Sequence, residues 1–300
     1  MIIIYDKPGQ LGNQLWAYSN IFVLAKECKS SVCVVLRNDV YPFLDIQSLT
    51  HNTEARIHIY KDTSTTGKLI SWLCRFFVLD SGKKKLFMKM LFFLPVTIEK
   101  NYKEETLFKN DFKKHRWYFI NSWENRINKK YFIQNNSFVR ELILPERSIR
   151  SLAEKKIQAL RQKYKMLIAV HIRRGDYKYF LDGKFFFDDD VYRSYMLQMK
   201  NFFQNEDALF YIFSNEEIDI NNYQGLHVHF DNSQAAAGDM WSMANCDYII
   251  GPVSTFSMWA SFWKQVPLYF IKGPNQDISK NNFRPVIAQD VFADGTAVEV

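Results

Sequence analysis

The stretch MLIAVHIRRGDY, residues 166–177, starts as an apolar run and ends in a group of polar side chains. The apolar part, residues 166–172, has the length and composition of an interior strand of a parallel sheet. His171 lies near the end of this strand, and Arg173, Arg174 and Asp176 follow it. Parallel α/β sheets bind ligands at the carboxyl ends of their strands, so the stretch predicts both a fold class and the place of a site.

Helices and strands alternate on both sides of this strand. Apolar periodicity predicts helices over residues 147–164, 190–203, 239–246 and 256–264, and strands over residues 208–214, 226–230, 247–251 and 267–271. This rhythm is typical of a doubly wound domain of the nucleotide-binding type.

The beginning of the chain has a similar pattern. A strand over residues 1–5, a turn, a helix over 15–28 and a strand over 31–37 form a β-α-β unit. We therefore expect an α/β protein with two Rossmann-like domains, 1–144 and 145–300, and an active site in the cleft between them. The first domain is expected to contain a helical, aromatic and basic insertion around residues 67–138, and the second to end in a C-terminal tail.

Composition and charge narrow the class of protein. Of 300 residues, 47% are hydrophobic, and no repeat occurs, so the chain is expected to be globular. The formal charge of +7 suits a partner that carries phosphate or an anionic surface. Much of the excess lies between Lys68 and Lys114, where an amphipathic helix either packs on the core with a solvated basic face, which we favour, or lies on an anionic membrane.

Cysteine usage and the N-terminus bear on location. The four cysteines are scattered and form no C-x-x-C pair, which favours reduced thiols over a metal or redox site. No signal peptide pattern is present, and no apolar run approaches the roughly 20 residues of a spanning helix. We expect a cytoplasmic protein, peripheral at the inner face of the membrane if the basic stretch binds lipid.

The two adjacent arginines are expected to do different work, because neighbouring strand residues point to opposite faces. One can bind a diphosphate bidentately, while the other pairs with a carboxylate such as Asp176. The alternative is an Arg–Asp pair that only stabilises a strand–helix connection. His171 either helps to bind the ligand or is a core histidine satisfied by a backbone carbonyl.

Two turns offer further polar groups. GPVSTFSMWASF, residues 251–262, places Ser254, Thr255 and Ser257 at the start of a helix, where hydroxyls either cap the helix or help to form an anion site. GQLGNQ, residues 9–14, matches neither the dinucleotide fingerprint nor the P-loop. Its glycines allow a ligand to approach the backbone, and its amides can bind a neutral polar ligand such as a sugar.

Three consecutive aspartates, Asp188, Asp189 and Asp190, allow a Mg²⁺ or Mn²⁺ interpretation. They directly precede or begin a predicted helix, where acidic side chains cap the free N–H groups and interact favourably with the helix dipole. We therefore interpret them as helix-capping residues and expect no metal.

Three blocks together resemble a known family. GQLGNQLWAYS, HIRRGDY and DMWSMANCDYIIGPVSTFSMWASF are similar, in order and approximate spacing, to the bacterial α-1,2-fucosyltransferases. The H-x-R-R-x-D block is the most specific and is shared with fucosyltransferases of other linkages. The resemblance implies a GT-B fold and transfer of L-fucose from GDP-fucose to a galactose-type hydroxyl of a glycan, with inversion and without metal.

The resemblance also implies residue roles. Arg173 is expected to contact the β-phosphate, His171 to help hold the donor, and Asp239 to lie near the nucleoside. Asn13 is expected to face the reaction centre. The remaining expected donor contacts are Arg174, Ser254, Thr255, Phe256, Ser257, Gly12 and Gln14.

The general base is left open. Core fucosyltransferases have a glutamate a few positions after the H-x-R-R-x-D block, but here Leu181 holds that place, with Asp182 beside it. Asp182 and Asp176 are the candidates, and Asp176 is expected to be structural through Arg174.

Several alternatives remain for the function. They are a transferase for another linkage or another GDP-6-deoxy sugar, and a non-catalytic relative that binds nucleotide or glycan. An NAD-type oxidoreductase would have only Asp39 as a ribose carboxylate and lacks the glycine fingerprint. The acceptor is expected to be an oligosaccharide or a lipid-linked glycan bound by the first domain, and no nucleic acid is expected.

Overall fold

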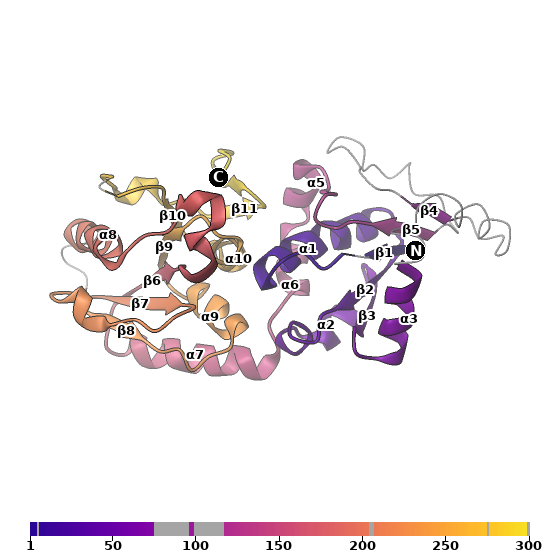
Figure 1. Cartoon of the computed structure of the whole chain (residues 1–300), viewed down its shortest axis with the longest axis horizontal. Coiled ribbons are helices and arrows are strands. Elements are labelled where there is room, and N and C mark those ends of the chain that lie inside the picture. The colour runs from indigo at the N-terminus through magenta and orange to yellow at the C-terminus, as the bar shows by residue number, and fades with distance from the viewer. Residues whose placement is uncertain (5, 75–95, 99–116, 204–206, 275, 299–300) are drawn as a thin grey trace. The chain divides into compact units, whose positions relative to one another are not determined.

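The computed structural model describes residues 1–300 except 5, 75–95, 99–116, 204–206, 275 and 299–300. The chain divides into two compact units, Met1–Glu146 and Arg147–Val300 (Figure 1). The sequence placed this division between residues 144 and 145.

The first unit is built on a parallel sheet with the strand order β3-β2-β1-β5-β4. Its central strand, β1 (Ile2–Ile4), pairs with β2 (Ser31–Leu36) on one side and with β5 (Trp117–Ile120) on the other. The outer strands are β3 (Arg56–Lys61) and β4 (Val96–Ile98). The predicted β-α-β opening is present.

Helices surround this sheet. Helix α1 (Leu11–Glu27) is buried along most of its length, and α3 (Thr65–Cys74) ends at Cys74, which packs on the sheet with Ile3, Cys33 and Phe119. The remaining helices of the described part are η1 (Tyr41–Phe43), α2 (Ile46–Thr50), α5 (Lys129–Gln134) and α6 (Asn136–Leu142).

The prediction of a helical insertion around residues 67–138 is wrong in part. Strand β5 lies within that range and pairs with β1, register Ile3 to Phe119, because its residues Tyr118, Phe119 and Ile120 are buried in the sheet. Helices α3, α5 and α6 do occur in the range. The basic stretch of residues 82–95 lies outside the described residues, and so does most of the proposed amphipathic helix beyond Cys74.

The second unit also contains a parallel sheet, with the order β10-β9-β6-β7-β8. The strands are β6 (Met166–Ile172), β7 (Ala208–Ser214), β8 (Val228–Phe230), β9 (Tyr248–Pro252) and β10 (Leu268–Ile271). A short antiparallel pair, β11 (Val286–Ala288) and β12 (Val291–Phe292), follows in the predicted tail.

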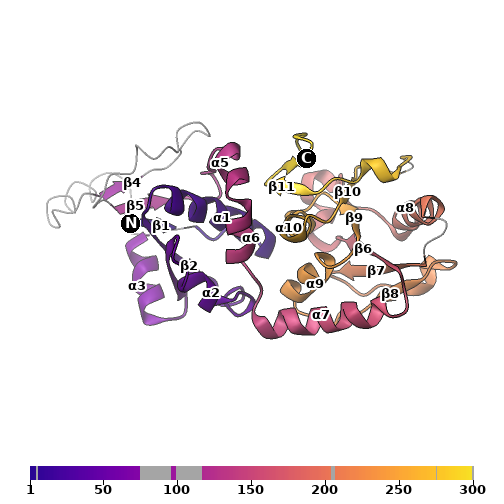
Figure 2. The same ribbon diagram turned by 180° about the vertical axis from the view of Figure 1, so that it is seen from behind.

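The helices of the second unit are α7 (Arg147–Arg161), α8 (Asp189–Phe202), α9 (Ala236–Met243) and α10 (Thr255–Lys264). Short 3-10 helices lie in the connections: η3 (Gly175–Lys178), η4 (Phe180–Gly183), η5 (Ile220–Tyr223) and η6 (Lys280–Asn282). Helices α7 and α9 run side by side (Figure 2), joined by a 2.9 Å hydrogen bond from Trp241 Nε1 to Glu154 Oε1.

The strand order reverses at β6. From β6 the chain moves to β7 and β8 in one direction, and it returns on the other side of β6 with β9 and β10. The carboxyl ends of β6 and β9 therefore form the topological switch point, where doubly wound sheets bind their ligands. Among the described residues, no helix is long and apolar enough to cross a membrane.

Candidate functional site

The switch point brings together two of the motifs that the sequence analysis singled out. HIRRGDY ends strand β6, and GPVSTF ends the adjacent strand β9, with Val170 in register with Ile250. Gly251 makes this approach possible: a Cβ atom there would lie 2.6 Å from the carbonyl oxygen of His171 and 2.9 Å from its Cβ. A larger residue at 251 would push the two strands apart.

Arg173 is held at this end of β6 by two neighbours. Its Nη2 lies 2.8 and 2.9 Å from the two carboxylate oxygens of Asp176, and its guanidinium carbon lies 5.7 Å from the centre of the Tyr177 ring. The Tyr177 hydroxyl in turn donates to the Val253 carbonyl at 2.7 Å. Tyr177 thus joins the turn after β6 to the turn before α10.

Arg174 makes a separate set of contacts. It donates to the Phe187 carbonyl at 3.0 Å and to Glu216 Oε1 at 3.1 Å, and it forms an ion pair with Asp189. Burial by itself lowers the pKa of Arg174, but the hydrogen bonds to the two carboxylates outweigh it and raise the pKa. These contacts make Arg174 a structural residue of the β6–α8 connection.

The expected pairing of Arg174 with Asp176 is wrong. Asp176 is three residues after Arg173, and the 3-10 turn η3 returns its carboxylate to Arg173. Both arginines therefore pair with carboxylates, Arg173 with Asp176 and Arg174 with Asp189 and Glu216.

Two of the three consecutive aspartates have different partners: Asp188 caps helix α8, and Asp189 pairs with Arg174. Asp188 is the N-cap of α8 and accepts from the Val191 N–H at 3.1 Å, which confirms the capping interpretation at this position. Asp189 accepts from Tyr223 and pairs with Arg174; burial raises its pKa, but these hydrogen bonds outweigh that effect and lower it. Within the part of the chain that the structure describes, no group of three or more His, Cys, Asp or Glu side chains is arranged to hold a metal ion.

His171 is buried beside Arg173. Only 5% of its surface is exposed, and its ring centre lies 5.3 Å from that of Phe256. Burial, together with the positive charge of Arg173, lowers the pKa of His171 to about 3, so the imidazole is neutral. Its Nδ1 is buried without a hydrogen-bond partner among the described residues, unlike a core histidine satisfied at that atom by a backbone carbonyl.

The N-terminus of α10 is capped by Ser254, whose hydroxyl accepts from the Phe256 N–H at 3.2 Å. Thr255 and Phe256 are partly exposed, and Phe256 contacts His171. Ser257 is fully buried and its hydroxyl donates to the Ser254 carbonyl. Its hydroxyl is therefore engaged inside the helix terminus, in contrast to the expectation that it lines the pyrophosphate.

Asp239 lies in the first turn of α9. Burial raises its pKa to about 7, while Lys156 lowers it and Asp231 raises it further. Its Oδ1 is buried and has no hydrogen-bond partner among the described residues. A carboxylate oxygen in this state is ready to accept a hydrogen bond from a ligand.

Asp182, the second candidate base, is exposed in the turn after η3. Leu181 and Asp182 have positive φ values of 47° and 55°, a backbone conformation that residues other than glycine rarely adopt. Such backbone strain is often found at functional sites.

The remaining predicted residues lie in the first unit. Gln14 is fully buried: it donates to the Gly9 carbonyl and accepts from Tyr18, so it shapes the loop, contrary to the expectation that it contacts the donor. Gly12 is also buried, whereas Asn13 is partly exposed and packs against Gly9, whose φ is +47°.

Two residues of structural importance were not singled out in the sequence. Tyr177 was quoted only as the last letter of its motif, although an aromatic residue directly after R-R-G-D is a signal of a contact nearby. Asp6 follows β1 and accepts hydrogen bonds from the backbone and hydroxyl of Ser122 at 2.6 and 2.9 Å, which joins the segment after β1 to the turn after β5.

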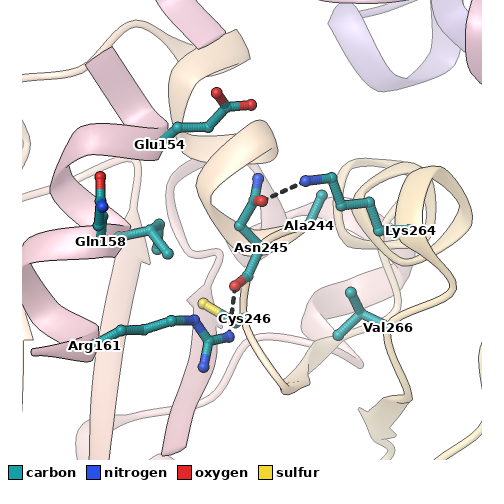
Figure 3. A pocket seen from close by; sticks show the side chains of 9 residues that line it. Glu154, Gln158, Arg161, Ala244, Asn245, Cys246, Lys264 and Val266 are labelled. Atoms are coloured by element: carbon teal, nitrogen blue, oxygen red, sulfur yellow. Dashed lines mark hydrogen bonds between the residues drawn. The ribbon is translucent and has the colours of Figure 1, made fainter. Parts of the chain in front are cut away.

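A cavity of about 470 Å³ is lined by residues of α7, of the segment after α9 and of the end of α10 (Figure 3). It is lined by Arg161 and by Lys264, among others, but Arg161 pairs with Asp247 and Lys264 donates to Asn245. Because Asp247 precedes β9, this cavity is close to the amino ends of the strands and away from the switch point.

One family model matches the chain. The model of the family described as Glycosyl transferase family 11 matches residues 68–280. No curated protein matches the sequence significantly.

Solved structures resemble the chain along most of its length. POFUT1 in complex with GDP-fucose has a TM-score of 0.59 at 12% identity, covering 90% of this chain and 97% of that one. Fucosyltransferase NodZ from Bradyrhizobium has a TM-score of 0.56 at 13% identity, covering 92% and 96%. An Arabidopsis thaliana FUT1 mutant in complex with GDP has a TM-score of 0.59 at 10% identity, covering 100% and 79%. These likenesses confirm the predicted GT-B fold class.

Proposed function

Because the chain belongs to glycosyl transferase family 11, we propose that it transfers L-fucose from GDP-fucose to a galactose-type hydroxyl of a glycan, in α-1,2 linkage and with inversion. The observation that carries this proposal is the position of Arg173 at the carboxyl end of β6, joined through Tyr177 to the turn that begins α10. The donor is supported by the three sequence blocks and by the similar fold of POFUT1, which was solved in complex with GDP-fucose.

Arg173 is proposed to bind the β-phosphate of the donor. When the glycosidic bond breaks, negative charge develops on the departing GDP, and a positioned guanidinium stabilises it most at that stage. The N–H groups and dipole at the start of α10, with Thr255 and Ser254, add a second source of positive potential. These groups supply the stabilisation that a divalent ion provides elsewhere, so we propose that no metal is needed.

Asp239 and His171 are proposed to hold the nucleoside. The buried Oδ1 of Asp239 can accept from an N–H group of the guanine base, and the neutral His171 is fixed against Phe256. Binding to an N–H donor would favour the ionised form of Asp239 and lower its raised pKa.

The proposed general base is Asp182. Single displacement with inversion needs a group that takes the proton of the acceptor hydroxyl. Asp176 is engaged by Arg173, whereas Asp182 is exposed at the turn that follows. Asn13 is proposed to face the reaction centre. The scattered free cysteines support a cytoplasmic location.

The decisive experiment is transfer from radiolabelled GDP-fucose to a panel of β-galactosides, with and without EDTA. We expect EDTA-insensitive transfer and a product cleaved by an α-1,2-specific fucosidase. Absence of transfer to every member of the panel, or a strict requirement for a divalent ion, would contradict the proposal.

A different linkage is the main alternative, because NodZ is an α-1,6-fucosyltransferase and shares the fold. Methylation analysis of the product distinguishes the two linkages. Calorimetry with GDP-fucose, GDP-mannose and UDP-galactose tests the donor, and donor binding without turnover would indicate a non-catalytic relative.

A further inference from the structure

Four large apolar side chains are exposed together on the connection between β6 and α8. They belong to what we call the apolar tip: Tyr179 is 79% exposed, Phe180 43%, Leu181 47% and Phe186 39%. Single exposed apolar residues are common on proteins, but a group in one short segment indicates a binding surface.

The apolar tip is carried by a well-anchored segment. Phe185 and Phe187 alternate with Phe186 and are buried, and Arg174 donates to the Phe187 carbonyl at 3.0 Å. At the other end, Tyr177 is fixed to Val253. The exposure of the tip is therefore a property of the folded segment, because Phe187 is buried after it and Tyr177 is hydrogen-bonded before it.

The tip is continuous with the proposed reaction site. The ring centre of Phe180 lies 5.3 Å from that of Tyr177, and the guanidinium carbon of Arg173 lies 5.7 Å from the same ring. Asp182 lies within the span of the tip, between Leu181 and Gly183, and all three of these residues have positive φ. An apolar surface, a carboxylate and the proposed phosphate-binding arginine thus lie on one short segment.

We propose that the apolar tip binds the acceptor, with Tyr179 and Phe180 packed against the C–H face of a galactose-type pyranose ring. This inference rests on the proposed function, which it extends from the donor to the acceptor. A pyranose ring has an apolar face of C–H groups and an edge of hydroxyls, so it is bound by aromatic surface together with a few polar groups. Asp182 is the polar group of the tip that would face the hydroxyl edge.

A lipid surface is the competing occupant, since Lys178 precedes the tip, Lys184 lies between Leu181 and Phe186, and the two ammonium groups lie over the rings of Tyr179 and Phe185. Two features favour the sugar. Lipid-binding basic segments carry clusters of about four to eight Lys or Arg residues, more than the two here. In addition, an anionic membrane would repel the carboxylate of Asp182 at the centre of the tip.

The experiment measures binding, so that it does not depend on turnover. Lactose, a soluble β-galactoside, is titrated into the full chain saturated with GDP, for the wild type, Tyr179→Ala, Phe180→Ala and the double variant. We expect the double variant to weaken lactose binding about tenfold or more, as for aromatic residues at the centre of an interface. GDP binding should stay within about twofold, since Phe180 contacts the ring of Tyr177 and not the guanidinium of Arg173 in the ring contacts given above.

Ile220→Ala is the matched control, because Ile220 is 52% exposed in the same unit but lies on η5. It should bind lactose as the wild type does. Lactose binding that is unchanged in the double variant, or absent in the wild type, would overturn the inference. If the double variant instead loses binding to vesicles of phosphatidylcholine and phosphatidylglycerol and keeps lactose binding, the tip is a membrane contact and the inference is wrong.

Failure of the proposed function gives a different pattern. If lactose binding depends on the tip but no fucose is transferred to any acceptor, the acceptor site stands and the transferase proposal fails. If transfer occurs and lactose binding does not depend on the tip, only the inference about the tip fails.

Discussion

The hydroxyl of Tyr177 donates a 2.7 Å hydrogen bond to the carbonyl oxygen of Val253. Tyr177 belongs to the turn after β6 and Val253 to the turn after β9, so this bond joins the carboxyl ends of two neighbouring strands at the switch point. Burial raises the pKa of Tyr177, which keeps the hydroxyl protonated and able to donate. The ring of the same residue lies against Arg173, so the bond sets the position of Arg173 relative to α10.

Removing this bond should weaken GDP binding while the ring stays in place. For Tyr177→Phe we expect the Kd for GDP to rise about threefold to tenfold, the effect of one hydrogen bond of about 0.5–1.5 kcal/mol. Tyr195→Phe is the control, since it removes a similar bond, 2.6 Å to the Gly273 carbonyl, away from the switch point. Equal GDP affinities for both variants and the wild type, measured by calorimetry, would show that Tyr177 does not position Arg173.

Replacing Arg173 by alanine should mainly reduce activity, whereas replacing Arg174 should mainly reduce stability. Arg173→Ala should lower kcat/KM for GDP-fucose about 10²–10³-fold, the cost of losing one electrostatic donor to the leaving group, and leave the melting temperature nearly unchanged. Arg161→Ala is the control, because Arg161 forms an ion pair with Asp247, which directly precedes β9 and so lies at the amino end of that strand. An Arg173→Ala enzyme with more than half of wild-type activity would remove Arg173 from the mechanism.

Arg174→Ala should mainly reduce stability. It leaves the partly buried carboxylates of Asp189 and Glu216 without their cation, at a cost of roughly 2–3 kcal/mol, somewhat less than for a fully buried ion pair. Urea denaturation of the full chain checks this value. A variant as stable as the wild type would show that these contacts contribute little.

Gly251→Ala should disturb both the sheet and the site. The added Cβ would lie 2.6 Å from the His171 carbonyl oxygen, so β9 must move away from β6. We expect a loss of about 1–3 kcal/mol in the free energy of unfolding, as for other overpacked sites, together with weaker GDP binding. Gly273→Ala is the control, since a Cβ there would meet its nearest atom only at 3.9 Å.

Asp239 should make stability fall as the pH rises. Its pKa is about 7 in the folded chain, above the ordinary value of 3.8 for an aspartate, so between about pH 4 and pH 7 the folded state holds more protons than the unfolded state. The free energy of unfolding should therefore decrease with pH in this window, by no more than about 1.4 kcal/mol per pH unit.

Asp239→Asn should remove this contribution. The stability of the variant relative to the wild type should increase from about pH 4 to pH 7 and stay constant above, with Lys156 and Asp231, the charged groups that influence Asp239, left in place. A difference that does not vary with pH would show that the carboxyl group titrates normally in the folded chain.

The elements near the site follow largely from local sequence. Strands β6, β7 and β9 are continuous apolar runs because both of their faces are covered, and α7 shows a clear apolar stripe, so each is visible in the order of its own residues. The same local reading missed β3 and β5. β3 is an outer strand with several exposed residues, and β5 is a four-residue strand in an aromatic segment whose pairing with β1 joins residues more than 110 positions apart.

The sequence by itself determined the α/β class, the two motifs at strand ends and the presence of an arginine suited to phosphate, because these depend on composition and spacing along the chain. Only the tertiary structure decided the partners: Asp176 for Arg173, Asp189 and Glu216 for Arg174, and Val253 for Tyr177. Several residues of either charge lie within reach along the sequence, and the choice among them depends on how the sheet and its turns bring distant segments together.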